Sequence, residues 1–357
     1  MNKRARENPS KVDLQVHTYY SDGNPDISLE EILELATKKF HLYGIAITDH
    51  NTIDGFREAQ EKAEKYDIEI YPGVEISVKD NTEFNWFDIH VLGYLFDPDN
   101  PELNKLLEDN IKARRSRIEK MVQKIQEHGL KITMPEVEAD ARNREPGSSH
   151  VARVLHRNNP ENIPHTEIAF DKIKRGGQFY VNEPMFAELG KVIQTIKHAG
   201  GVSILAHPEK YGEIKGIYRE GELILQEGAK DIECLLKTVV RKGIDGIEVI
   251  YPYHNSFLPK IAIKTETLDL KEIRLPHGSI KGNLIDDEKR TVSLAKRLNE
   301  IYHHFARQQH LLMSGGSDYH GRDTRRKMSN GEFSVPLELV ENMKKYIARR
   351  NPQLVSK

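Results

Sequence analysis

Cysteine is almost absent from this chain of 357 residues, which contains a single one, Cys234. One thiol excludes a disulfide framework within the chain and any zinc site built from several cysteines. No apolar run reaches the roughly 18 residues of a membrane span. The opening residues 1–10 are polar and lack the apolar segment of a signal peptide, which predicts a flexible N-terminus. We therefore expect a cytoplasmic protein without membrane attachment.

The chain also lacks an excess of charge of either sign. Its formal net charge is -2, although 30% of its residues are charged and 38% are hydrophobic. So small a net charge provides no global basic field to attract nucleic acids or membranes. The composition is that of a globular protein, and the length allows one large domain with an insertion or two modest domains.

Seven short runs rich in Val, Ile, Leu and Tyr predict β-strands, and most of them precede an amphipathic helical pattern. The runs are Val12–Val16, Tyr43–Ile47, Ile68–Tyr71, Phe87–Leu95, Val202–Leu205, Gly246–Ile250 and Leu311–Met313. The predicted helices include Ser28–Phe40, which begins with a capping box of Ser28 and Glu31, and Asp54–Lys65, Asp231–Lys242 and Asp287–His304. This alternation predicts an α/β fold with a parallel sheet, either open or closed into a barrel.

The alternation of strands and helices is interrupted between Pro101 and Leu189. This stretch has a charged helical pattern followed by loop-rich sequence, and the alternation resumes at Val202. We therefore predict a discontinuous α/β domain over residues 11–100 and 189–350, with an inserted, mainly helical domain over residues 101–188. The stretches Tyr211–Gly228 and Phe257–Asp286 predict further long loops, which in a compact domain are usually functional or mobile.

The chain contains 16 histidines, and their placement relative to the strands is informative. Carboxyl ends of parallel strands converge at one edge of a sheet, where active sites are built. Imidazole and carboxylate ligands together suit zinc, manganese and iron, and a carboxylate bridging two ions suits phosphate ester hydrolysis. Any one such residue is more simply a structural residue after a strand, but six of the seven runs deliver one: Gln15-Val16-His17 with Asp22, Asp49-His50, Val74-Glu75, Asp88-Ile89-His90, Ala206-His207 and Asp318-Tyr319-His320.

These motifs, from Asp13 to His320, resemble those of the PHP (polymerase and histidinol phosphatase) superfamily. The insertion is similar to that of the branch containing nucleoside 3′,5′-bisphosphate phosphatases and 5′-end exoribonucleases, notably over Arg115–Leu130 and Gly147–Leu155. The resemblance implies a distorted seven-stranded β/α barrel. It also implies two or three divalent metal ions at the carboxyl end of that barrel, drawn from manganese, zinc, iron and magnesium.

The resemblance implies nine metal-ligating positions in three sets. They are Gln15, His17, Glu75 and Asp318 for the first ion, Glu75, His90 and His207 for the second, and Asp22, His50 and His320 for the third. The implied reaction is hydrolysis of a phosphomonoester or RNA end on a nucleotide-like substrate by a metal-activated hydroxide. Glu75, Asp22 and His320 are the predicted catalytic residues, with Asp22 or His320 as a proton shuttle.

The chain departs from the family pattern at two places. Gln15 stands where the family has histidine, and because an amide oxygen is a weaker donor, the first ion is weakened, replaced by a harder ion, or absent. Ser148-Ser149-His150 stands where related proteins have Arg-Pro-His, so an arginine suited to gripping phosphate is missing.

Three residues are predicted to bind substrate: His150, Arg175 as a replacement for the missing arginine, and His254 after the sixth run. Lys174 is a second possible replacement, whereas we interpret the Arg114–Arg117 run as a solvated helix face. Two alternatives stay open, a histidinol-phosphate phosphatase and a catalytically disabled barrel that binds nucleotides. In each case the expected ligand is a phosphorylated small molecule, a nucleotide or an RNA end, and no protein partner is predicted.

Overall fold

The computed structural model describes residues 11–80, 86–142, 145–174, 177–181, 186–208, 215–219, 222–225, 230–252, 262–265, 299–300, 302–321, 328 and 333–351. One sheet has four strands in the order β12 (Val335–Pro336), β1 (Lys11–Val16), β2 (Gly44–Ile47) and β3 (Glu69–Tyr71). A second sheet has five strands in the order β11 (Leu312–Gly315), β9 (Gly246–Ile250), β6 (Val202–Leu205), β5 (Trp86–Tyr94) and β4 (Gly73–Asp80). A third, smaller sheet contains β10 (Ala262–Thr265), β7 (Lys215–Arg219) and β8 (Glu222–Leu225).

The two larger sheets meet at two isolated parallel bridges. Val16, at the end of β1, pairs with Tyr319, and His50, just after β2, pairs with Glu75 of β4. The mixed α/β fold that the sequence predicts is therefore confirmed. The closed seven-stranded barrel is not, because the strands form separate four-stranded and five-stranded sheets joined only by single bridges.

The prediction of a parallel sheet is wrong at β5, which runs antiparallel to both β4 and β6. Only residues 81–85 separate β4 from β5, and a parallel neighbour requires a crossover of a dozen or more residues. The third predicted run also divides, because β3 ends at Tyr71 and β4 begins at Gly73. As a result Glu75 lies within a strand and not after the end of the third run, where the sequence placed it, whereas His90 lies within β5 as it lay within the fourth predicted run.

Three of the four predicted helices are present in the described residues. Ser28 caps α1 (Leu29–Glu34) in the predicted capping box with Glu31, and the helix continues as a π-helical segment over Leu35–Lys39. The second is α2 (Asp54–Lys62), extended by a 3-10 turn, and the third is α8 (Lys230–Arg241). Most of the predicted helix Asp287–His304 lies outside the described residues, although residues 302–308 are helical. Two further helices, α7 (Leu189–His198) and α10 (Glu338–Arg350), also pack against the strands.

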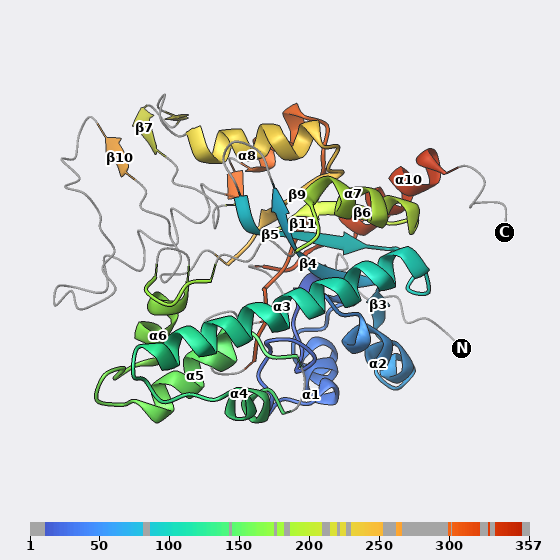
Figure 1. The fold of residues 1–357 in the computed structure, drawn as a ribbon. Helices are drawn as coiled ribbons and strands as arrows, with labels where there is room; N and C mark the ends of the chain where they lie inside the picture. Colours follow the sequence, from blue (N-terminus) through green and yellow to red (C-terminus); the bar gives the residue numbers. More distant parts are fainter. Residues whose placement is uncertain are drawn as a thin grey trace.

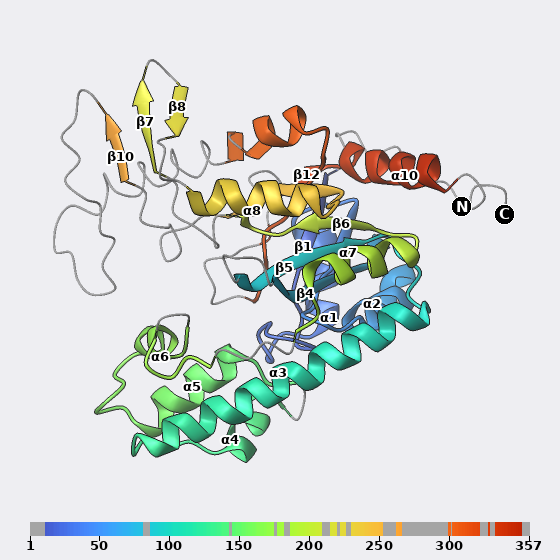
Figure 2. The same ribbon diagram turned by 45° about the horizontal axis from the view of Figure 1, so that its top comes forward.

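The long helix α3 (Pro101–Glu127) links two hydrophobic clusters. Its first half packs with the strands through Leu103 and Leu107, and its second half packs through Met121 and Ile125 against the shorter helices. Those helices are α4 (Met134–Asp140), α5 (Ser148–Asn158) and α6 (Thr166–Ile173). Figures 1 and 2 show α4–α6 gathered at one end of α3, away from α7 and α8. The division into a domain over residues 101–188 and a discontinuous domain around it stays a prediction.

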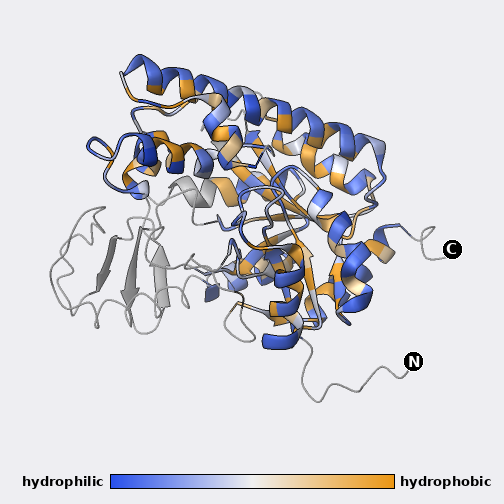
Figure 3. Ribbon diagram, turned by 90° about the horizontal axis from the view of Figure 1, so that it is seen from below, coloured by the Kyte–Doolittle hydropathy of each residue, from blue (hydrophilic) through white to orange (hydrophobic). Residues whose placement is uncertain are grey.

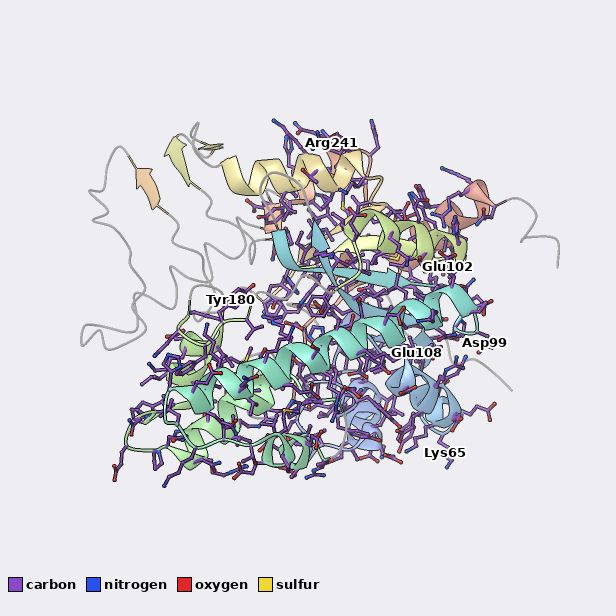
Figure 4. The ribbon with its side chains drawn as sticks, viewed as in Figure 1. Lys65, Asp99, Glu102, Glu108, Tyr180 and Arg241 are labelled. Carbon is purple, nitrogen blue, oxygen red and sulfur yellow. The ribbon has the colours of Figure 1, made fainter. Side chains whose placement is uncertain are left out.

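Apolar and polar residues alternate along α3, and Figure 3 shows both colours along its length. A buried Asn110 attaches this helix to the strands, because its side chain donates to the Ser77 carbonyl at 2.8 Å and to Asn51 Oδ1 at 3.0 Å. Asn51 follows His50, so α3 and the helices packed on it are held next to the end of β2. In Figure 4 the labelled side chains Lys65, Glu108 and Arg241 point outward from the helices. No helix in the described ranges is both long and apolar enough to traverse a bilayer.

Candidate metal centre

The end of β1 is held against the end of β11 by a buried aspartate. Asp13 accepts hydrogen bonds from the backbone N–H of Ser317 at 2.9 Å and from its hydroxyl at 2.6 Å. Burial raises the pKa of Asp13 to about 6, and the hydrogen bonds from Ser317 oppose this rise. A Cβ on Gly316 would lie 2.4 Å from the backbone nitrogen of Gln15, so only glycine allows the approach. This contact brings Asp318 beside His17.

His17 is buried between two carboxylates. Its Nε2 lies 3.0 Å from Glu75 Oε2 and 3.1 Å from Asp318 Oδ1. Burial alone would lower the pKa of His17, but Asp318 and Glu75 outweigh burial and raise it well above its ordinary value. Gln15, two residues earlier on the same strand face, donates from Nε2 to Glu75 Oε2 at 3.1 Å.

Glu75 stands at the middle of the group, because its second oxygen faces two further histidines. Glu75 Oε1 lies 2.6 Å from His90 Nδ1 and 2.9 Å from His207 Nε2, and these two ring nitrogens are 3.3 Å apart. Burial would raise the pKa of Glu75, but the neighbouring imidazoles, His50 and His90 first among them, hold it well below its ordinary value. Each carboxylate oxygen therefore faces imidazole nitrogen on its own side.

The carboxylate of Asp22 lies near the two remaining histidines, His50 and His320. It is 3.2 Å from His320 Nε2 and 3.6 Å from His50 Nε2. Burial lowers the pKa of His50 to about 4, although Asp22 acts in the opposite direction. The neighbouring Asp49 is occupied elsewhere, because it accepts from the backbone and hydroxyl of Thr18 and from the hydroxyl of Ser21. Asp49 thus shapes the loop that carries Asp22.

The chemistry of these side chains fits divalent cations. Both ring nitrogens of His17, Nδ1 of His50 and Oε1 of Gln15 are buried without a hydrogen-bond partner among the described residues. Ring nitrogens that crowd around shared carboxylate oxygens, several of them without a hydrogen-bond partner, suit a divalent metal ion. Three groups bring their ligand atoms within 4.8 Å of one another: His17, Asp22, His50 and His320; His50, Glu75 and His90; and His17, Glu75 and Asp318. All nine predicted metal positions thus lie in one cluster, while their roles as ligands stay predictions.

Tyr251 takes part in this cluster in a way that the sequence did not indicate. Its hydroxyl donates to Asp318 Oδ2 at 2.6 Å, and its ring contacts the ring of His207 with 5.4 Å between centroids. The side chain is buried, so it packs inside the cluster. Because the Tyr251 hydroxyl donates to Oδ2, it does not compete for Asp318 Oδ1, which is the oxygen nearest His17.

His150, a predicted substrate-binding residue, lies at the N-terminus of α5. It is buried, and its Nδ1 accepts a hydrogen bond from the backbone N–H of Gly147 at 2.9 Å. Burial first, and then the charges of Arg153 and Arg114, lower the pKa of His150 to about 4, against the opposing charge of Asp22. The influence of Asp22 indicates that this helix end lies toward the metal-binding cluster.

Arg114 is a functional candidate that the sequence analysis missed. A Cβ on Gly147 would lie 2.1 Å from its Nη2, so the guanidinium occupies the space that glycine leaves at the start of α5. No hydrogen bond or ion pair involves Arg114 within the described ranges, whereas Arg115 pairs with Glu119 and Glu138. The interpretation of the Arg114–Arg117 run as a solvated helix face is therefore wrong for Arg117, which is buried, and for Arg114, whose guanidinium packs against Gly147. The glycine before Ser148 was the available signal.

The other predicted substrate contacts are not placed next to this cluster. Arg175 and His254 lie outside the described residues. Lys174 is described and pairs with Asp171 at 2.5 Å.

Residues 13–249 match the family model described as the PHP domain. The chain belongs to the PHP family. This result confirms the resemblance drawn from the motifs and, with it, the class of metal-dependent phosphoesterases, which are hydrolases.

Relatives of this PHP protein have been named. It is 30% identical over 201 residues, or 56% of its length, to a 5′-3′ exoribonuclease of Haemophilus influenzae, of which 70% is covered. It is 26% identical over 247 residues, or 69% of its length, to a 3′,5′-nucleoside bisphosphate phosphatase of Chromobacterium violaceum, of which 79% is covered. A solved structure from Bifidobacterium adolescentis, assigned to the metal-dependent phosphoesterases, has a TM-score of 0.64 at 24% identity, covering 93% of this chain and 94% of that one. The last likeness bears on the fold alone.

Proposed function

We propose that this PHP protein hydrolyses phosphate esters of nucleotide-like substrates, either phosphomonoesters or RNA ends, at a centre of two or three divalent ions. The observation that carries the proposal is the position of Glu75, whose two carboxylate oxygens face imidazoles on opposite sides. A carboxylate in that position suits a bridge between two ions in a site for phosphate ester hydrolysis.

The ligands divide into three sets around shared carboxylates. Glu75, His17 and Asp318 would hold one ion with Gln15, Glu75 would share a second with His90 and His207, and Asp22, His50 and His320 would hold the third. When bound, such ions lower the pKa of water and neutralise charge on the phosphoryl oxygens.

Neighbouring groups orient two of these ligands. The Nδ1 of His320 lies 2.7 Å from the Asp318 carbonyl, which can only accept, so Nδ1 carries the proton and Nε2 presents its lone pair toward Asp22. His320 is then better suited to ligation than to proton transfer. Asp22, whose side chain is 19% exposed, is the more accessible candidate to take a proton from water. Tyr251 holds Asp318 by its other oxygen.

Arg114, His150 and the first turn of α5 are proposed to bind a phosphate of the substrate other than the one hydrolysed. The guanidinium forms no ion pair or hydrogen bond with a carboxylate in the described part of the chain, although its charge acts on Glu145, and the first-turn amides of a helix generally lack an intrahelical acceptor. Substrates with two phosphates, such as a nucleoside bisphosphate or an RNA 5′ end, satisfy both places at once. The names of the two curated relatives support the same substrate class.

The test is phosphate or nucleotide release, with manganese present, from adenosine 3′,5′-bisphosphate, 5′-phosphorylated RNA, adenosine 5′-monophosphate and histidinol phosphate. We expect kcat/KM for one of the first two to exceed that for the other substrates at least about tenfold, because one charge-assisted contact contributes about 1.5–3 kcal/mol. A preference for histidinol phosphate would support that alternative activity. Nucleotide binding without turnover in manganese, zinc, iron and magnesium would support the disabled barrel.

A further inference from the structure

Gln15 is the one predicted metal ligand that is neither imidazole nor carboxylate. Its side chain is completely buried on β1, and its amide is fixed by Glu75. The amide nitrogen must be the atom that faces Glu75, because a reversed amide would place its oxygen against a carboxylate oxygen. The orientation of Gln15 therefore follows from its neighbour.

The amide oxygen of Gln15 is left without a donor. Gln15 Oε1 is buried and has no hydrogen-bond partner among the described residues. An unsatisfied buried acceptor costs about 1–3 kcal/mol, so such an atom is retained where a cation or a water satisfies it. Glu75 Oε2, which the same amide holds, is also the oxygen next to His17 Nε2 at 3.0 Å. Gln15 therefore contacts, through Nε2, the carboxylate oxygen that lies beside His17, and its Oε1 has no competing donor among the described residues.

We propose that Gln15 ligates the first ion through Oε1 while its Nε2 orients Glu75, and that it makes this position selective for a hard ion, manganese or magnesium, over zinc. The inference rests on the metal centre of the proposed function. With glutamine, the donors are His17 nitrogen and the oxygens of Gln15, Glu75 and Asp318. With histidine at position 15, two of the four donors would be nitrogen. Oxygen-rich sets favour magnesium and manganese, whereas imidazole suits zinc.

The selectivity has a second cause in the hydrogen bond to Glu75. A histidine bound to an ion through one ring nitrogen cannot also donate from that atom to Glu75. Gln15 uses separate atoms for the two tasks, so Glu75 Oε2 keeps one lone pair on the amide and offers the other to the ion. Both the amide oxygen and Glu75 Oε2 then remain available to the ion. This larger ligand number suits the near-octahedral sets that magnesium adopts better than a tetrahedral zinc site, which uses fewer ligands.

The experiment measures binding of Mn²⁺ and Zn²⁺ alone, without substrate, to the chelator-stripped full chain and to Gln15→His and Gln15→Leu. Calorimetry gives the affinities, and elemental analysis after dialysis against equimolar Mn²⁺ and Zn²⁺ gives the stoichiometry. Gln60→His, on the exposed side of α2, is the control for adding a histidine. Thermal denaturation in chelator identifies any variant that has lost its fold.

We expect Gln15→His to bind Zn²⁺ at one position roughly 10–100-fold more tightly relative to Mn²⁺, the range by which neighbours of a site tune its affinity. Gln15→Leu should lose one manganese ion per chain, and Gln60→His should behave as the unchanged protein. An unchanged ratio of zinc to manganese in Gln15→His, or full manganese stoichiometry in Gln15→Leu, overturns the inference. Should Gln15→Leu not fold, the comparison with Gln15→His still decides.

Failure of this inference is distinguishable from failure of the proposed function. Unselective metal binding together with phosphate release from a bisphosphate would overturn only the role of Gln15. Selective binding of manganese with no release from any phosphoester would leave Gln15 as a ligand and overturn the hydrolase.

Discussion

The cluster around Glu75 and the helix end around Arg114 differ in which charged and polar groups have partners. In the cluster, carboxylates lie 2.6 to 3.2 Å from imidazoles, and several buried nitrogen and oxygen atoms have no hydrogen-bond partner among the described residues. At the start of α5, a guanidinium lies close to Gly147 and forms no ion pair in the described ranges, although its charge acts on Glu145. The first arrangement suits cations and the second suits an anion, so the same substrate can be bound at one place and hydrolysed at the other.

Glu75→Gln should have the largest effect, because it removes the charge on which both sides of the cluster converge. We expect kcat/KM for a bisphosphate to fall at least roughly 10³-fold, the upper end of the loss for one electrostatic contact in an active site. Steady-state phosphate release in manganese measures the change. Glu69→Gln, an exposed glutamate on the neighbouring β3, is the matched control. Near-normal turnover by Glu75→Gln would contradict the proposal that hydrolysis requires Glu75.

Arg114→Ala should distinguish phosphate binding at the start of α5 from hydrolysis at the cluster around Glu75. The lost charge-assisted contact should raise KM for adenosine 3′,5′-bisphosphate about 10–100-fold and leave kcat and KM for the 5′-monophosphate nearly unchanged. Arg115→Ala, which removes an adjacent arginine already paired with Glu138, is the control. Equal losses on both substrates would mean that Arg114 acts on the fold or on the cluster, and not on a second phosphate.

Gly147→Ala sharpens the same comparison without removing the charge. The new Cβ would meet Arg114 Nη2 at 2.1 Å, so the flexible guanidinium must move away from the start of α5. As in Arg114→Ala, we expect KM to rise for the bisphosphate and not for the 5′-monophosphate. The size of the rise should lie between those of Arg115→Ala and Arg114→Ala. A substrate-independent effect would count against the proposed position of the guanidinium.

Tyr251→Phe should weaken the cluster more mildly than loss of a ligand. It removes the 2.6 Å hydrogen bond that orients Asp318, and loss of such a partner typically lowers metal affinity roughly tenfold to 100-fold. Calorimetric titration with Mn²⁺ measures the effect, with Tyr346→Phe on α10 as the control. Added manganese should restore the rate, which it would not do if Tyr251 acted directly on substrate.

His150 should report on the helix end through stability at acid pH. Burial first, and then Arg153 and Arg114, lowers its pKa in the folded chain to about 4 from the ordinary 6.5. The unfolded chain therefore takes up a proton first, so the stabilisation is complete above pH 6.5 and is lost as the pH falls toward 4. At pH 5 the loss relative to pH 7 should be about 2 kcal/mol, as each pKa unit corresponds to about 1.4 kcal/mol. Urea unfolding at pH 7 and pH 5 measures the free energy of unfolding. The decrease between the two pH values should be about 2 kcal/mol smaller in His150→Gln than in the wild-type chain.

The cluster was predictable from the sequence because its residues sit at short, fixed offsets from recognisable strands. Gln15 and His17 share a strand face, and the other positions lie within apolar strands or shortly after them, so closure of the α/β fold brings them together. The direction of β5 was not predictable in this way, since an apolar strand has the same pattern whether it runs parallel or antiparallel to its neighbours.

The role of Arg114 depends on tertiary packing that periodicity does not encode. It lies on α3 far in sequence from Gly147, and it reaches the start of α5 only because these two helices pack together. In sequence it is indistinguishable from Arg115, which pairs with carboxylates on its own side. Fixed offsets from strands revealed the first region, whereas a contact between helices revealed the second.

The most direct test of the metal centre is anomalous diffraction from crystals of the full chain soaked in Mn²⁺. We expect manganese peaks on either side of Glu75, one beside His90 and His207 and one beside His17 and Asp318, with ligand oxygens at about 2.0–2.6 Å. A third peak beside Asp22, His50 and His320 would complete the centre. Peaks elsewhere with none beside Glu75, at manganese concentrations that support turnover, would contradict the account.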